Sequence, residues 1–485
     1  MLRKIRTAAA IVVFTLACFL FVSGSLSVYF TWVIHAQLVP AILSGSLITA
    51  ALLLSVTMLF GRLYCSVLCP LGILQDIFSR FGAAGRFQYS KGKPRMRLVF
   101  LLIFVTSLLA GTPIIFNLLE PYSAFGRIAA AILSPVWQLG INVLARIAEH
   151  YESYLVSATP VWIKGAASLT VALLTLLVIG WLSYRGGRSW CNTVCPVGTA
   201  LGFLNRYALI HPRIKKADCV HCGICAKKCK ASCIDSKKAC IDASRCVVCL
   251  NCLDVCPKKA LSYTVPKWLK TPGHHVHSTT ELLRRNFAVA AAGTLATLLL
   301  KPASVFPDSG EVDALTRKRP YRRAVPVLPP GAHSLETFSD HCTGCQLCVS
   351  ICPNQVLSVS GQLLEAPQPN LSFERGYCRP NCVDCSNVCP TGAIRPITLP
   401  EKSALQIGMA VAVPARCLLS QGEICVACSR NCPTAAIEKM EANDGKSYLT
   451  INTEHCTGCG ACEYYCPIRP QAAIQVRGND VQRLI

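Results

Sequence analysis

Cysteine spacing restricts the fold of this chain more than any other feature. The sequence holds 31 cysteines among 485 residues. Most of them stand in groups of four with gaps of two or three residues, and a proline follows nearly every group. An odd number of cysteines at such short gaps does not fit a framework of disulfides between distant segments. Each group instead fits one polynuclear metal centre held by several thiolates.

Two of these groups lie between residues 211 and 263, each with the spacing C-x2-C-x2-C-x3-C. Bacterial ferredoxins use this run for cubane [4Fe–4S] clusters, and the fourth cysteine of each run ligates the other cluster. Structural zinc sites usually draw on two well-separated pairs and are disfavoured. One cluster is predicted to take Cys219, Cys222, Cys225 and Cys256, and the other Cys246, Cys249, Cys252 and Cys229.

One of these two groups departs from the ferredoxin pattern. Cys229 is followed by Lys230 instead of proline, and Cys233 lies four residues further on. Cys233 is therefore an alternative ligand to Cys229, and the role of Cys240 stays open.

Four further groups fill the C-terminal part of the chain, and each ends in Cys-Pro. The first and fourth have the strict spacing, the second opens with C-x3-C, and the third opens with a gap of seven residues. In chain order the groups are Cys342, Cys345, Cys348 and Cys352; Cys378, Cys382, Cys385 and Cys389; Cys417, Cys425, Cys428 and Cys432; Cys456, Cys459, Cys462 and Cys466. These sixteen thiolates predict four [4Fe–4S] clusters, with little apolar core beyond them.

Long apolar runs occupy the N-terminal part. The chain is 52% hydrophobic and 15% charged, which indicates that part of it lies in lipid. Runs at 8–29, 38–60, 98–119 and 166–184 each approach the ~20 residues that a membrane-spanning helix needs. Residues 1–205 are therefore predicted to form a membrane domain of four helices.

The charges of the loops predict the orientation of this domain. Residues 61–97 carry seven basic side chains and one acid, residues 31–37 carry no Lys or Arg, and the charges of residues 119–165 balance. Because basic loops mark the cytoplasmic side, residues 61–97 are predicted inside and residues 119–165 outside. The net charge of +23 is likewise attributed to Lys and Arg in cytoplasmic loops and around the cluster-binding modules. Nucleic-acid binding is disfavoured because no basic stripe interleaves with aromatic residues.

A sequence repeat stands at two predicted cytoplasmic helix ends. The segments G-R-L-Y-C-S-V-L-C-P-L-G and G-R-S-W-C-N-T-V-C-P-V-G place Cys65 and Cys69 in one copy, and Cys191 and Cys195 in the other. The four thiolates can share one metal centre, or each pair can act as a redox-active dithiol near a quinone. A third interpretation is that the motif only shapes a helix end, which the proline closes.

Residues 281–306 are predicted to be a fifth membrane helix. Arg284 and Arg285 precede an apolar run of 14 residues, in the R-R-x-F pattern of a twin-arginine export signal. Clusters are inserted in the cytoplasm, so a cluster module bound for the other face must cross the membrane folded, as this route permits. The alternative is an amphipathic or buried helix of a cytoplasmic domain, because 14 apolar residues are few for a span. The Pro-rich, basic residues 307–335 are predicted to be a linker.

Two known families resemble the two parts of the chain. Residues 1–265 resemble the NapH family of membrane ferredoxins, with four helices, two C-x3-C-P motifs and a two-cluster block. Residues 281–485 resemble the NapG/MauM family of exported polyferredoxins, through R-R-N-F, the approach at 328–345 and four cluster motifs in order. The resemblance implies a fusion of the two. The expected fold is a membrane protein of about five transmembrane α-helices. It carries α+β bacterial-ferredoxin-like modules on both sides, two clusters in a cytoplasmic module (206–270) and four in a periplasmic one (336–485).

The resemblance also implies a ligand pairing for the four C-terminal groups, in which the outer groups pair and the inner groups pair. For this chain the resemblance implies four ligand sets, each with three cysteines of one group and the last cysteine of another. In the outer groups, Cys342, Cys345 and Cys348 share a cluster with Cys466, and Cys456, Cys459 and Cys462 share one with Cys352. In the inner groups, Cys378, Cys382 and Cys385 share a cluster with Cys432, and Cys417, Cys425 and Cys428 share one with Cys389.

The implied function is electron transfer in the bacterial inner membrane. Electrons pass from menaquinol or ubiquinol, or from a cytoplasmic donor, to a periplasmic reductase or c-type cytochrome. Quinol oxidation needs a proton acceptor near the membrane face, and Glu120 is the first candidate, with His35 second; each is alternatively a loop residue or helix cap. The competing interpretations are a redox-sensing or maturation protein for a periplasmic metalloenzyme, and a chain whose clusters are all cytoplasmic.

Overall fold

The computed structural model describes residues 2–22, 30–82, 87–152, 156–159, 161, 165–264, 318, 323–359, 368–441 and 447–485. The predicted export signal at 281–306 lies outside the described residues, and so does most of the predicted linker at 307–335. Met1–Thr264 and Lys318–Ile485 form one compact unit.

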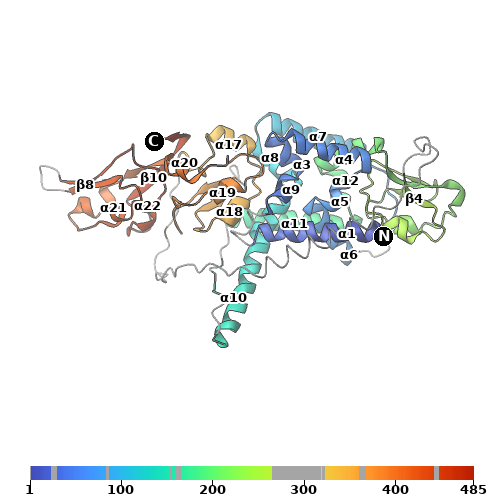
Figure 1. The fold of residues 1–485 in the computed structure, drawn as a ribbon, viewed down its shortest axis with the longest axis horizontal. Coiled ribbons are helices and arrows are strands. Elements are labelled where there is room, and N and C mark those ends of the chain that lie inside the picture. The colour runs from blue at the N-terminus through green and yellow to red at the C-terminus, as the bar shows by residue number, and fades with distance from the viewer. Residues whose placement is uncertain are drawn as a thin grey trace. The chain divides into compact units, whose positions relative to one another are not determined.

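The N-terminal part of this unit is helical (Figure 1, blue to green). In chain order its helices are α1 (Leu2–Leu20), α2 (Trp32–His35), α3 (Leu38–Leu43), α4 (Leu47–Phe60), α5 (Tyr64–Val67), α6 (Pro70–Phe81), α7 (Pro94–Leu109), α8 (Pro113–Leu119), α9 (Pro121–Ile128), the π-helical turn η2 (Ala129–Leu133), α10 (Ser134–His150), α11 (Ala166–Gly186), α12 (Ser189–Thr193) and α13 (Pro196–Leu204).

Among the described residues, two helices are long and apolar enough to cross a membrane. One is Pro121–His150, which joins α9, η2 and α10, and the other is α11. The prediction of about five membrane helices is therefore not supported by helix length and composition.

Local breaks explain the difference. The 19 residues of α1 include the three basic residues Arg3, Lys4 and Arg6. The run at 38–60 divides into α3 and α4 around Gly45, whose φ of +71° is strained for any residue with a Cβ. The run at 98–119 divides before Pro113, where α8 begins.

Residues 119–165 also differ from their prediction as an outer loop, because most of them lie in the helix Pro121–His150. Figure 1 shows its second half, α10, extending away from the neighbouring helices. The prediction of a loop rested on the balanced charges of this segment. These charges are few and widely spaced along a segment that is otherwise apolar, so they do not prevent a long helix.

Proline begins several of these helices. It occupies the first turn of α6, α7, α8, α9 and α13, where a missing backbone N–H costs no hydrogen bond. In the repeated motif, Pro70 and Pro196 therefore open α6 and α13. This corrects the interpretation in which the proline closes a helix.

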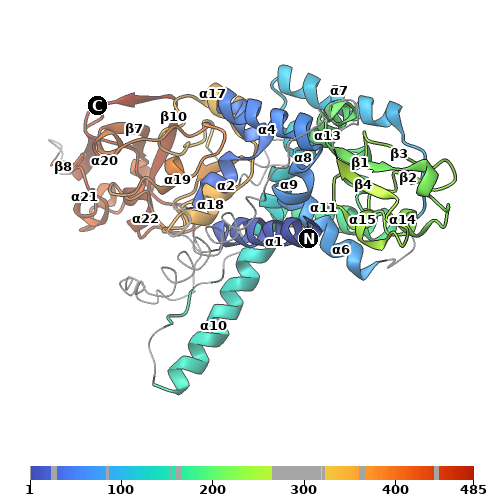
Figure 2. The ribbon, with the colours of Figure 1, turned by 45° about the vertical axis from the view of Figure 1, so that its right-hand side comes forward.

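The first cysteine module follows directly after the helices (Figure 2, green). Strand β1 (His211–Ile214) pairs antiparallel with β4 (Leu261–Thr264), and β2 (Ile234–Asp235) pairs with β3 (Cys240–Ile241). Two short helices, α14 (Ile224–Lys227) and α15 (Asn251–Val255), pack against each other between the strands. Each cysteine group thus supplies one helix to a pseudo-symmetric module.

The C-terminal part combines short helices with two-stranded sheets (Figure 2, yellow to red). Its helices are α17 (Leu335–His341), α18 (Leu347–Ile351), α19 (Asp384–Asn387), α20 (Leu399–Ser403), α21 (Ala427–Arg430) and α22 (Ala461–Tyr465). Its strands pair as β5 (Leu357–Val359) with β6 (Pro369–Leu371), β7 (Leu405–Ala412) with β10 (Ile474–Leu484), and β8 (Ile437–Glu441) with β9 (Ser447–Ile451).

This part has more apolar core than predicted. Phe338, Phe373 and Val476 are almost fully buried in one continuous hydrophobic cluster that also contains cysteines of all four groups. The long β7–β10 pair brings the C-terminal strand back beside the middle of the module, which the local cysteine pattern does not indicate.

Candidate iron–sulfur sites

The first site lies in the N-terminal cysteine module. Its cavity is lined by Cys219, Cys222, Cys225 and Cys256, the same four cysteines that the spacing groups together. Gly223 has a φ of +76° and begins α14, so the chain turns sharply between the second and third cysteines. Three sulfurs close in sequence therefore face the same space, and the fourth comes from the end of the other group.

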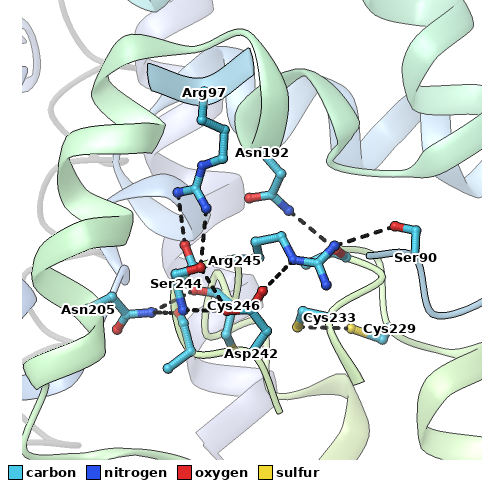
Figure 3. Close-up of polar contacts among 12 residues, drawn as sticks. Ser90, Arg97, Asn192, Asn205, Cys229, Cys233, Asp242, Ser244, Arg245 and Cys246 are labelled. Atoms are coloured by element: carbon cyan, nitrogen blue, oxygen red, sulfur yellow. Dashed lines mark hydrogen bonds and ion pairs between the residues drawn. The ribbon is translucent and has the colours of Figure 1, made fainter. Parts of the chain in front are cut away.

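The second site in this module brings together five thiols. Cys229 and Cys246 interact electrostatically, and Cys249 and Cys252 lie beside them. Cys233 is 1% exposed, and its sulfur lies 3.5 Å from that of Cys229 (Figure 3). The structure thus keeps Cys233 as an alternative to Cys229, whereas Cys240 is exposed.

Side chains from the helical part hold this second site in place. Arg97 of α7 donates to the Oγ and the carbonyl of Ser244, each at 3.2 Å, and the amide of Asn205 donates to the carbonyl of Cys246 at 3.0 Å. Figure 3 shows both side chains directed at the loop that ends in Cys246. Hydrogen bonds therefore attach the cysteine module to the start of α7 and to Asn205, just beyond the end of α13.

In the C-terminal part, the structure groups the cysteines differently from the pairing implied by the resemblance. One cavity is lined by Cys342, Cys345, Cys348 and Cys389, a second by Cys352, Cys378, Cys382 and Cys385, and a third by Cys417, Cys425, Cys428 and Cys466. Cys459 interacts electrostatically with Cys432, which completes a fourth set with Cys456 and Cys462.

Neighbouring groups therefore pair, the first with the second and the third with the fourth. The reason is packing: α18 lies against α19, and α21 lies against α22, as α14 lies against α15 in the first module. The last cysteine of one group can reach only the site formed by the first three cysteines of the group that packs beside it. The two pairs touch where the backbone N–H of Cys378 donates to the carbonyl of Cys459 at 2.9 Å.

The donor sets fit [4Fe–4S] clusters. Each of the four cavities is lined by four cysteines among mostly apolar groups. Backbone N–H groups point at sulfurs, such as Ala473 N at 3.3 Å from Cys466 Sγ and Ile394 N at 3.4 Å from Cys389 Sγ. Across the described ranges, no three His, Cys, Asp or Glu side chains are close enough to hold a single metal ion.

Lys402 is a charged neighbour of one site that the sequence does not indicate. Its Nζ lies 3.2 Å from Cys378 Sγ and 2.9 Å from the carbonyl of Cys382. Burial by itself lowers the pKa of Lys402, but the adjacent cysteine sulfurs outweigh burial and raise the pKa above its usual value. A positive charge therefore stands beside this site.

The two C-x3-C-P repeats come together in the structure. Gln75 of α6, just after the first copy, donates to Cys191 Sγ of the second copy at 3.2 Å. Arg62 of the first copy reaches both Cys65 Sγ, at 3.7 Å, and the carbonyl of Cys191, at 3.4 Å. No role in this site was predicted for Arg62 or Arg188 from the sequence. The Gly-Arg pair that both copies of the motif share is the pattern that could have indicated one.

Asp76 anchors a group of cations beside these repeats. It pairs with Arg188 at 2.8 Å, with Lys230 at 3.4 Å and with Arg6 at 3.9 Å. Burial raises the pKa of Asp76, but the Arg188 guanidinium and the other two cations outweigh it and lower the pKa to about 2. This carboxylate therefore ties α1, α6 and the N-terminus of α12 to the cysteine module.

The predicted proton acceptor Glu120 is a helix cap. It is 1% exposed and precedes α9, where its carboxylate accepts from the backbone N–H of Ser123. It also lies close enough to interact electrostatically with Cys345 and with Tyr64. His35 ends α2 and is exposed.

Helix α11 has one cysteine module at each end. Near its start, Ser168 Oγ accepts from Gln346 Nε2 at 2.9 Å, next to Cys345. Just beyond its end, the backbone N–H of Arg188 donates to the carbonyl of Lys230 at 2.8 Å, next to Cys229. The two modules are thus separated by the length of this helix.

Comparison with known proteins agrees with the paired groups. The model of a "4Fe-4S binding domain" matches residues 44–86 and 168–217, and the model of a "4Fe-4S dicluster domain" matches residues 341–393 and 423–469. The two segments of the second match hold the first two cysteine groups and, apart from Cys417, the last two, which agrees with the neighbouring pairs of the cavities. No solved structure matches the chain.

Several curated proteins are similar to parts of the chain. The methylamine utilization ferredoxin-type protein MauM of Methylobacillus flagellatus is 36% identical over 34% of this chain and 73% of its own length. Ferredoxin-type protein NapG of Escherichia coli is 34% identical over 31% of this chain and 70% of its own length. The putative electron transport protein YccM of Escherichia coli is 21% identical over 47% of this chain and 58% of its own length. The chain therefore belongs to the MauM/NapG family of ferredoxin-type proteins and is an iron–sulfur electron-transfer protein that holds 4Fe–4S clusters.

Proposed function

We propose that this protein carries electrons across the bacterial inner membrane, from the quinol pool or a cytoplasmic donor to a periplasmic oxidoreductase. The observation that carries the proposal is α11 with a cysteine module at each end. Its 21 residues span about 31 Å at 1.5 Å per residue, close to the ~30 Å hydrocarbon thickness of a bilayer. A helix of this length and composition separates two modules by one membrane.

The proposed architecture joins a NapH-like membrane part to a NapG/MauM-like exported part, with more than the two longest helices in lipid. Leu47 and Ile48 of α4 are 78% and 86% exposed, and Leu109 of α7 is 81% exposed. Such exposed apolar faces suit contact with lipid better than contact with water. In this proposal the segment at 281–306 returns the chain to the periplasm, and its arginines direct export of a folded module.

The proposed ligand sets form a continuous series. Two sites in the cytoplasmic module lie at one end of α11, and the site of Cys342, Cys345, Cys348 and Cys389 lies at the other end. The contact between Cys378 and Cys459 then joins the remaining sites. A bound [4Fe–4S] cluster accepts and donates one electron at a time. The chain's own contribution is to bring the cysteines of each site together and to place the sites one after another.

Glu120 is proposed to take a proton when a quinol gives up two electrons and two protons. The substitution Glu120→Gln removes the base, so quinol should no longer reduce the clusters in membrane vesicles, whereas dithionite should still reduce them. Glu149→Gln, at the exposed end of α10, is the matched control. Unchanged kinetics of quinol-driven reduction in Glu120→Gln would remove this residue from the mechanism and leave it as a helix cap.

Topology provides the decisive test of transmembrane transfer. A phosphatase that folds only outside the cytoplasm, fused after Ile485, should be active, and replacing both Arg284 and Arg285 by lysine should abolish that activity. An inactive phosphatase together with an active cytoplasmic reporter at the same position would place all clusters on one face and end the proposal. Quinol-driven reduction that reaches no external acceptor would instead favour the sensing or maturation alternative.

The acceptor is proposed by class only. The MauM relatives are named for methylamine utilization. For this chain, a periplasmic reductase or a c-type cytochrome suits an exported series of one-electron sites.

A further inference from the structure

The two C-x3-C-P repeats are related by an exchange of arginines. Arg62 of the first copy donates to the carbonyl of Cys191 in the second, and Arg188 of the second copy donates to the carbonyl of Cys65 in the first. Each copy therefore places its arginine on the backbone of the first cysteine of the other copy.

Glycine is required on both sides of this exchange. A Cβ at Gly72 would collide with the carbonyl of Cys65 and with the guanidinium of Arg188. A Cβ at Gly198 would collide with the carbonyl of Cys191 and would crowd Arg62. The last glycine of each motif thus makes room for the arginine of the other, and the two copies form one built site.

All four sulfurs of this site are buried and receive N–H donors. Cys65, Cys69, Cys191 and Cys195 are each at most 4% exposed. The donors are Arg62 for Cys65, Gln75 for Cys191, and the backbone N–H groups of Gly198 for Cys195 and Gly72 for Cys69. Four buried sulfurs that face N–H donors form the same kind of donor set as the cysteines of the ferredoxin-type sites.

The surroundings carry an excess of buried positive charge. Arg62 and Arg188 are both 0% exposed. Arg188 shares the single carboxylate of Asp76 with Lys230 and Arg6. Within the part of the chain that the structure describes, Arg62 has no carboxylate partner, and its bonds go to Asn192, Ser244 and the cysteine residues. A buried cation without a counter-charge is strongly unfavourable, so this site calls for an anion.

We propose that Cys65, Cys69, Cys191 and Cys195 together hold one iron–sulfur cluster, a seventh centre in addition to the six sites of the ferredoxin modules. Four thiolates around an oxidised [2Fe–2S] or [4Fe–4S] core carry a net charge of about −2, which offsets most of the excess positive charge around Arg62 and Arg188. Two separate dithiols or disulfides are uncharged and leave Arg62 without a counter-charge and Arg188 with only the shared carboxylate of Asp76. Each matched "4Fe-4S binding domain" segment holds only two of these cysteines, so the site is complete only where the two segments meet.

The site of the four cysteines lies next to one of the ferredoxin-type sites. Arg62 also donates to the carbonyl of Ser244 at 3.2 Å, and Asn192 donates to that of Ala231 at 3.3 Å, so the site adjoins the second cytoplasmic site. On its other side, Tyr64 hydrogen-bonds to Gln37 at 2.8 Å within the helical part. The seventh centre therefore lies between the cytoplasmic module and the interior of the helices.

Iron and sulfide analysis of the full-length protein, purified without oxygen, tests the proposal. Six cubane clusters contain about 24 iron atoms, and a seventh centre raises the count to about 26 or 28, according to its nuclearity. Single substitutions Cys65→Ser and Cys191→Ser, one in each copy, should lose the same two or four iron atoms and the same electron paramagnetic resonance signal. Cys18→Ser is the control, because Cys18 belongs to neither motif.

The remaining iron in each variant shows whether it folds, since about 24 atoms should stay bound. If the wild-type protein holds about 24 iron atoms and its Cys65, Cys69, Cys191 and Cys195 all react with an alkylating agent, the proposal is wrong. One bound zinc atom that Cys65→Ser removes would also overturn it. These outcomes do not depend on the direction of electron flow or on the membrane topology.

A second measurement uses the arginines and not the ligands. Removing the buried positive charge in Arg62→Gln should shift the reduction potential of the extra signal to a more negative value. Arg62→Lys should restore part of the shift, and Arg206→Gln, on the exposed side of the same region, should leave it unchanged. An identical potential in Arg62→Gln and wild type would contradict the proposed charge balance.

Discussion

Ser168 and Gln346 lie 178 residues apart in the sequence and are joined by a side-chain hydrogen bond of 2.9 Å. Ser168 stands near the start of α11, and Gln346 stands between two cysteines of the first C-terminal group. Both side chains are buried. This bond ties a cluster-binding loop to the end of a helix that is long enough to cross a membrane.

The first prediction concerns this bond. Gln346→Ala leaves the Ser168 hydroxyl without its partner in a buried position, so the free energy of unfolding should fall by about 1–3 kcal/mol. Ser168→Ala should cost less, because it removes a smaller polar group. A double-mutant cycle measured by chemical denaturation should show coupling of about 0.5–3 kcal/mol. Additive effects of the two substitutions would mean that the contact does not join the two parts.

The second prediction concerns which cysteines share a cluster in the C-terminal part. Cys389→Ser should remove the same electron paramagnetic resonance signal as Cys342→Ser, because both cysteines line one cavity. Cys466→Ser should leave that signal intact and should remove the signal that depends on Cys417. If Cys466→Ser and Cys342→Ser abolish the same signal, the outer pairing holds and the structural grouping fails.

The third prediction concerns the charge of Lys402 beside Cys378. Lys402→Met should make the reduction potential of that cluster more negative by on the order of 50–100 mV, because a positive charge favours the reduced, more anionic state. Potentiometric titration of the full-length protein measures the shift. Lys402→Arg should keep most of the charge effect, and Lys439→Gln, on the exposed strand β8, should have no effect.

The fourth prediction concerns Asp76, whose pKa is lowered to about 2 from 3.8. Because the unfolded chain binds this proton at a higher pH than the folded chain, stability should fall as the pH drops from about 4 to about 2. Asp76→Asn should remove that pH dependence.

The same substitution leaves Arg188, Lys230 and Arg6 without their counter-charge, so it should cost about 3–5 kcal/mol at neutral pH. Acid and denaturant unfolding curves measure both effects. Asp218→Asn breaks only an exposed pair with Lys215 and should change stability by less than about 1 kcal/mol. Equal effects of Asp76→Asn and Asp218→Asn would contradict the importance of the buried network.

Local sequence patterns determined much of the chemistry of this protein. Cys219, Cys222 and Cys225 line one cavity because the two-residue gaps between them keep the three cysteines within one turn of the chain. The apolar run at 166–184 likewise predicted α11 closely, because no proline and no charged residue interrupts it. Gly45 and Pro113 indicate where the runs at 38–60 and 98–119 divide into two helices each. The prediction rested on the average hydrophobicity of each run, which does not depend on these single residues.

Only the tertiary structure decided which separate segments meet. The fourth ligand of each site depends on which short helix packs beside which, so Cys389 joins the first group although the implied pairing assigned Cys466. The two C-x3-C-P repeats stand more than a hundred residues apart, and only packing brings Arg62 to Cys191 and Arg188 to Cys65. Spacing along the chain specifies local geometry, whereas contacts between distant segments depend on the complete arrangement of helices, sheets and buried charges.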